Sequence, residues 1–122
     1  MQGILAAPNL PAGACPDRLR PFADRFRAEA ARRGRSGAGL ALAYARSIHD
    51  VSGLVLGAET LGQVRENAAM FEDEPLTVDE RLALDAAVGT PPDDLVDISG
   101  WAAFQAASAD ASADADPGRE AR

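Results

Sequence analysis

The chain has 122 residues and a mass of 12.7 kDa, which is enough for one domain and too little for two. It is 47% hydrophobic and 25% charged, and nothing in it approaches the ~20 continuous apolar residues of a membrane span. The first residues lack the basic and apolar regions of a secretory signal. One cysteine, Cys15, excludes an internal disulfide framework and favours a reducing, cytoplasmic setting.

Residue types that carry chemistry are scarce. All 12 basic residues are arginine, which excludes Schiff-base and lysine-dependent acid–base chemistry. His49 is the only histidine and has no nucleophile motif near it, so we expect neither a Cys/His metal site nor Ser-His-Asp catalysis. The single tyrosine, Tyr44, lies in an Ala-rich stretch and is interpreted as a packing residue. We therefore expect no catalytic residue and no metal ligand.

The net charge of −7 is unevenly distributed. Residues 1–49 contain eight arginines against three acids, a balance of +5, and residues 50–122 contain four arginines against sixteen acids, a balance of −12. The arginines of the first half surround an apolar stripe of Leu19, Phe22 and Phe26, as on the solvated side of an amphipathic helix. Without a recognition motif or interleaved aromatics, and with a pI near 4.6, nucleic-acid binding is not expected.

The first half of the chain predicts one short strand and two helices. Residues 2–6 are an apolar run that fits the end of a strand, and a Pro/Gly-rich loop follows them. A helix is expected from Pro16 or Asp17 to about Gly34. A second, Gly/Ala-rich helix is expected from its cap at Ser36 to about Ser47.

Residues 51–57 (VSGLVLG) are a short, nearly continuous apolar run. This pattern predicts a strand covered on both faces, as in a parallel sheet. Thr60 and Gln63 then form a capping box that starts a third helix. The residues expected to face inward from that helix are Leu61, Val64, Ala68 and Phe71.

A second capping box, Thr77 with Glu80, predicts a fourth helix that ends at Gly89. The residues expected to face inward from it are Val78, Leu82 and Val88. Residues 93–104 are predicted as an irregular ending, and residues 105–122 as a disordered acidic Ala/Asp-rich tail. Two short strands would leave unpaired edges, so the pattern predicts the C-terminal part of a larger α/β protein.

A strand, a glycine at its end and a capped helix form a natural anion site, and a structural turn without a ligand is the alternative. The sequence GAETLGQVREN at residues 57–67 resembles the cofactor segment of the aldo/keto reductases. The LALAY run at residues 40–44, the QGIL at residues 2–5 and the layout of residues 76–84 and 97–101 are also similar to that family. The resemblance covers about residues 1–101.

The resemblance implies an oxidoreductase that reduces aldehydes and ketones with NAD(P)H. The implied fold is α/β, with residues 1–104 as the C-terminal part of a (β/α)8 TIM barrel, partial rather than closed. It also implies two sets of cofactor contacts. Those to the adenosine phosphates, the ribose and the adenine are expected at Gly57, Ala58, Thr60, Gln63, Glu66 and Asn67. Those to the pyrophosphate are expected at Gln2, Gly3 and Leu5. Glu59 lies where many members have Arg, Lys or Ser, and its carboxylate opposes a 2′-phosphate, so NADP and NAD both remain open.

The family's catalytic Asp, Tyr, Lys and His have no counterparts here, so the chain alone is expected to be an inactive C-terminal fragment. Its expected partners are the nicotinamide dinucleotide and a small carbonyl substrate in the full-length context, with no nucleic acid and no membrane. The alternative is a non-catalytic protein-interaction module that uses the acidic half or the Arg-rich helix. A further alternative is a half-barrel that self-associates through exposed strand edges.

Overall fold

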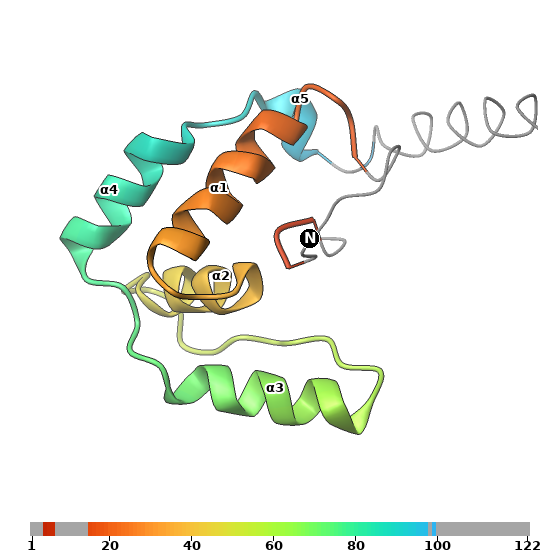
Figure 1. The fold of residues 1–122 in the computed structure, drawn as a ribbon, viewed down its shortest axis with the longest axis vertical. Helices are drawn as coiled ribbons and strands as arrows, with labels where there is room; N and C mark the ends of the chain where they lie inside the picture. The colour runs from red at the N-terminus through yellow and green to blue at the C-terminus, as the bar shows by residue number, and fades with distance from the viewer. Residues whose placement is uncertain (1–3, 7–14, 98, 100–122) are drawn as a thin grey trace, which may run out of the picture.

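The computed structural model describes residues 4–6, 15–97 and 99. Within these ranges the chain forms five helices: α1 (Arg20–Arg32), α2 (Gly37–Arg46), α3 (Leu61–Glu72), α4 (Val78–Val88) and α5 (Asp93–Val96). Helix α1 packs on both α4 and α2, whereas the main helix contact of α3 is with α2. Figure 1 shows α3 as a separate arm, with residues 51–60 running beside it as a long open connection.

The expected α/β fold, a partial TIM barrel, is wrong. The described residues contain helices and turns and no strand, and the two predicted strands do not pair. Residues 4–6 form a turn, and residues 51–58 have no regular secondary structure. A strand requires a neighbour for its ladder of hydrogen bonds, and an apolar run alone cannot supply one.

The predicted helices are confirmed, and local signals explain where they begin and end. Ser36 accepts a hydrogen bond at its Oγ from Gly39 N–H (3.0 Å) and starts α2. Both predicted capping boxes are present, at Thr60 for α3 and at Thr77 for α4. Gly34 (φ 66°) follows α1 and Gly89 (φ 78°) follows α4, in a left-handed conformation that favours glycine after a helix.

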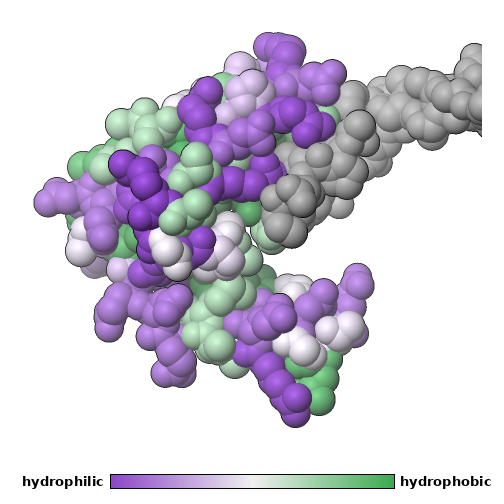
Figure 2. All heavy atoms as spheres, viewed as in Figure 1, coloured by the Kyte–Doolittle hydropathy of each residue, from purple (hydrophilic) through white to green (hydrophobic). Residues whose placement is uncertain are grey.

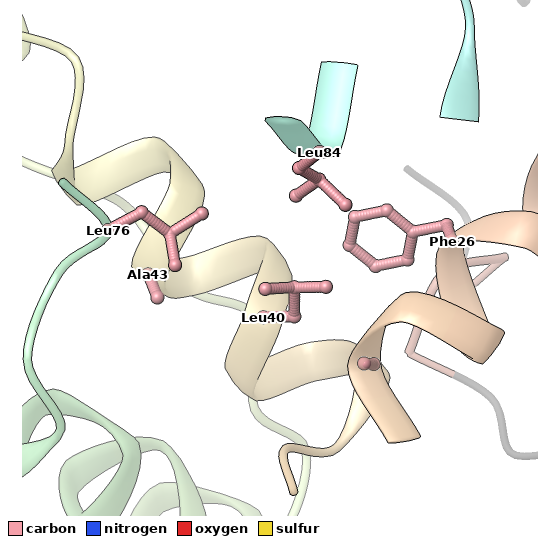
Figure 3. Packing of buried hydrophobic residues seen from close by; sticks show 6 residues of the cluster. Phe26, Leu40, Ala43, Leu76 and Leu84 are labelled. Carbon is pink, nitrogen blue, oxygen red and sulfur yellow. The ribbon is translucent and has the colours of Figure 1, made fainter. Parts of the chain in front are cut away.

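The main core lies where α1, α2 and α4 meet. Figure 3 shows the side chains of Phe26, Leu40 and Leu84 converging from these three helices. The buried members of this cluster are Phe26, Ala30, Leu40, Ala43, Leu76 and Leu84. Hydrogen bonds from Arg25 Nε to the carbonyl oxygen of Val88 (2.8 Å) and from Tyr44 Oη to Asp85 Oδ1 (2.9 Å) tie α4 to its neighbours.

A smaller cluster holds the N-terminal turn against α1. Ile4, Cys15 and Ala23 are buried together, and Arg27 Nη2 donates to the carbonyl oxygen of Ile4 (2.8 Å). This anchoring places Leu5 over α2, where its carbonyl oxygen leaves no room for a side chain at Gly37. The N-terminal turn therefore covers the start of α2.

The predicted inward face of α3 is wrong, and that of α4 is wrong at two of its three residues. Helix α3 has no buried residue, and its Leu61 is 64% exposed. In α4 the buried residue is Leu84, while Val78 and Leu82 are 61% and 58% exposed. The periodicity of an apolar stripe identifies a face but not the neighbour that covers it. The rest of each stripe is exposed, whereas Val88 of α4 is partly buried and packs against the main core as predicted.

Several predictions fall on other parts of the chain. Gln2, Gly3 and the tail at residues 105–122 lie outside the described residues, as does most of the predicted irregular ending after residue 97. Among the helices that are described, none has the length and apolar character needed to cross a membrane.

Candidate functional site

The segment predicted to bind the cofactor folds into a capped helix start. Thr60 Oγ1 accepts a hydrogen bond from Gln63 N–H at 3.2 Å. The side-chain oxygen of Gln63 accepts in return from the N–H groups of Glu59 (2.6 Å) and Thr60 (3.3 Å). The predicted capping box thus fixes the turn from residue 59 to residue 63 through three hydrogen bonds.

The capping box leaves two backbone donors open at the start of α3. The N–H groups of Leu61 and Gly62 make no hydrogen bond within the described part of the chain, and both residues are exposed. The first turn of α3 contains no acid. Open N–H groups and the positive end of the helix dipole together favour an anion at this position.

Asn67, in the second turn of α3, is hydrogen-bonded to Gly57, which precedes the helix start. Its Nδ2 donates to the carbonyl oxygen of Gly57 at 3.2 Å. Two of the predicted site residues, ten positions apart, are thereby held together. Gly57, Ala58 and Glu66 are also exposed, so this side of α3 is open to solvent.

The site opens onto a groove of ≈ 340 Å³ between α2 and residues 54–57. Gly57 and Asn67 form one part of its lining, and Leu5 forms another. Of the three N-terminal residues predicted to contact the cofactor, Leu5 is therefore brought to the same groove as the 57–67 segment. Gln2 and Gly3 lie outside the described residues.

The other long helices offer no comparable start. Helix α4 has Asp79 and Glu80 in its first turn, and these carboxylates repel an anion. The start of α2 is covered by Leu5. Helix α1 has no side-chain cap, and the N–H group of Arg20 donates to Asp17 O at 3.2 Å. The start of α1 is also free of acids in its first turn, but the N–H groups of Arg20 and Phe22 are already hydrogen-bonded, so among these four helices α3 combines an uncovered start, an acid-free first turn and open N–H groups.

One residue near this site was not predicted. Arg65 is the only cation of α3 and lies one turn after Leu61. Side chains on a helix tilt toward its N-terminus, so Arg65 belongs to the face above Leu61. The signal that could have identified it is a single positive charge one turn after the cap, followed directly by Glu66.

Groups suited to proton transfer lie elsewhere. Tyr44 donates to Asp85 between α2 and α4, and burial, with the hydrogen bond and charge of Asp85 next, raises the pKa of Tyr44. His49 is fully exposed, with Nδ1 3.3 Å from Asp50 Oδ1. Within the described ranges no group of three or more His, Cys, Asp or Glu is placed to hold a metal ion.

Comparison with known proteins adds no assignment. No family model matches the chain, and neither a curated protein nor a solved structure matches it.

Proposed function

We propose that the 57–67 segment binds the adenosine-phosphate end of a nicotinamide dinucleotide, and that the chain is part of an aldo/keto reductase-like oxidoreductase acting on aldehydes or ketones. The observation that carries this proposal is the uncovered start of α3, whose first turn contains no acid and where Leu61 and Gly62 present open N–H groups. A phosphate accepts from such donors and is attracted by the helix dipole. The resemblance of residues 57–67 supports the dinucleotide over other phosphates.

The binding role does not extend to catalysis by these residues. The chain has no lysine, and its single tyrosine is hydrogen-bonded to Asp85, on helices other than α3. We expect the pure chain to show no turnover of NADPH with an aldehyde. A reducing, cytoplasmic setting is part of the same proposal and rests on the single, buried thiol of Cys15.

Titration with NADP⁺ and NAD⁺, followed by amide NMR, tests the binding site. We expect the largest shifts at Leu61 and Gly62. Thr60→Ala should weaken binding about tenfold, because the loss of the cap loosens the turn that presents both donors. Thr77→Ala is the matched control, because it removes the same kind of cap from α4 and should leave nucleotide affinity unchanged. Shifts centred on α4, or equal losses in both variants, would contradict the proposal.

The preference between the two dinucleotides depends on Glu59. Its carboxylate is exposed beside the start of α3, where it opposes the extra charge of a 2′-phosphate. Glu59→Gln in the same titration should raise affinity for NADP⁺ more than affinity for NAD⁺. An equal change for both would place the 2′ position away from Glu59.

A protein-interaction role is the second candidate, and the uncovered apolar side chains favour it. Val55, Leu61 and Val64 are exposed on or beside the α3 arm, and Figure 2 shows hydrophobic atoms at the tip of the arm in the lower part of the view. The Arg-rich helix supports this role less well. Its arginines are largely engaged within the chain, as in the ion pairs of Arg32 (2.8 Å) and Arg33 (3.4 Å) with Glu29.

A further inference from the structure

Residues 51–57, here called the open segment, are tied down at both ends and free in the middle. The N–H of Val51 donates to the carbonyl oxygen of Ile48 (3.1 Å), and the carbonyl oxygen of Gly57 accepts from Asn67 (3.2 Å). Between them, the backbone of residues 52–56 makes no hydrogen bond in the described part of the chain. A series of donors and acceptors is therefore available along the segment.

The second half of the open segment presents consecutive apolar side chains. Val55 is 103% exposed. Leu54, Val55 and Leu56 all border the ≈ 340 Å³ groove, whose opposite wall is α2 with Ala38, Ala41 and Ala45 among its residues. Short alanine side chains allow another backbone to approach closely. The lining contains no charged residue, so the groove fits an apolar occupant.

The free backbone decides what kind of occupant fits. An extended chain can pair with successive N–H and C=O groups along the segment, as when a peptide adds a strand to an exposed edge. A helix cannot, because its own backbone groups are already paired within it. The open segment therefore fits a strand rather than a helix.

Negative charges at both ends of the open segment determine which incoming strands would bind favourably. Asp50 precedes the segment and Glu59 closely follows it, and both are exposed. The Asp50 carboxylate lies 3.3 Å from the ring nitrogen Nδ1 of His49, and Glu59 makes no ion pair within the described residues. A second copy of the chain, paired in either direction, would bring two carboxylates together at each end, which is destabilising. Basic residues at the ends of the incoming strand complement both acids.

We propose that the open segment is a docking edge for an apolar β-strand of a partner that carries arginine or lysine at both ends. This inference rests on the interaction role proposed above and gives it a partner of defined chemistry. Main-chain pairing supplies the affinity, and the two acids supply the selectivity.

A peptide of about nine residues, alternating Val and Thr with Arg at both ends, tests the proposal with the full chain. We expect saturable binding with new exchange protection at residues 52–56. Val55→Pro should weaken it at least about tenfold, because proline removes a donor. Val55→Thr, the matched control, should change it less than about threefold. Val55 is exposed and unpaired, so both variants should keep the helical circular dichroism of the parent chain.

A peptide of the same pattern with Glu at both ends should bind about tenfold more weakly at low salt, and the difference should shrink in high salt. Equal binding of the two peptides, or equal binding to Val55→Pro, would overturn the proposal. A dimer of the chain alone that Val55→Pro abolishes would make a second copy the occupant and also overturn it. If an amphipathic helical peptide binds and the strand peptide does not, the interaction role stands and the strand docking fails. If neither binds, both fail.

Discussion

Glu80 shows how one ionised side chain determines the start of a helix. Its carboxylate accepts from Thr77 N–H (2.8 Å) and from the Thr77 hydroxyl (3.0 Å). The backbone hydrogen bond, followed by the side-chain one, lowers the pKa of Glu80 below its ordinary value. A lowered pKa in the folded state means that this carboxylate stabilises the fold above its ordinary pKa, and that the contribution disappears as pH falls.

Glu80→Gln should therefore be less stable than the parent chain at pH 7 and should approach it in stability as pH falls through the lowered pKa of Glu80 in the folded state, below which the carboxylate is protonated in both states. Urea unfolding at a series of pH values measures this difference. Glu66→Gln is the control, since Glu66 is also an exposed acid on a helix but makes no cap. A constant difference between Glu80→Gln and the parent across this pH range would show that ionisation plays no part.

Helices α3 and α4 begin alike and pack differently. Both have a complete Thr capping box, yet α4 buries Leu84 in the core and α3 buries nothing. Capping signals lie within four residues and can be seen in the sequence, so the starts at Thr60 and Thr77 were predictable. Burial depends on residues far away in the chain. The exposure of the α3 stripe could not be predicted because the sequence does not say which face of the helix a neighbour covers, and the pairing expected of the open segment fails because its backbone has no partner in the described part of the chain.

Amide hydrogen exchange should separate the two helices. We expect the amides of α3 to exchange at least about tenfold faster than those of α1 and α4, because few buried contacts oppose local opening of the arm. Addition of a dinucleotide or of the strand peptide should slow exchange in α3 and the open segment first. Equal protection in α3 and α4 without a ligand would contradict the view of α3 as an uncovered arm.

At the scale of the whole molecule, stability depends on the meeting point of three helices. Leu40 is fully buried between α1 and α4, and Phe26 and Leu84 close the cluster around it (Figure 3). Helix α2 thus connects elements that are far apart in sequence. The same helix lines the groove beside the open segment with its other face.

Leu40→Ala should lower the free energy of unfolding by about 2–5 kcal/mol, because it removes buried methyl groups and leaves a cavity. Val55→Ala is the matched control and should change stability by less than about 0.5 kcal/mol, since its side chain is in solvent. Urea unfolding followed by circular dichroism measures both. A loss below about 1 kcal/mol for Leu40→Ala would mean that the three helices do not share one core.

The open segment also divides the sequence between two pairs of helices that remain in contact in the fold. It separates α1 and α2 from α3 and α4 in the sequence, while α1 and α4 pack together across that division. A single cut of the backbone between residues 52 and 56 would leave a basic and an acidic fragment joined by Phe26 against Leu84, by Arg25 on the carbonyl of Val88 and by Tyr44 on Asp85. The chain is thus arranged as two complementing halves, and reassembly of separately made fragments would measure directly how strongly the basic half holds the acidic one.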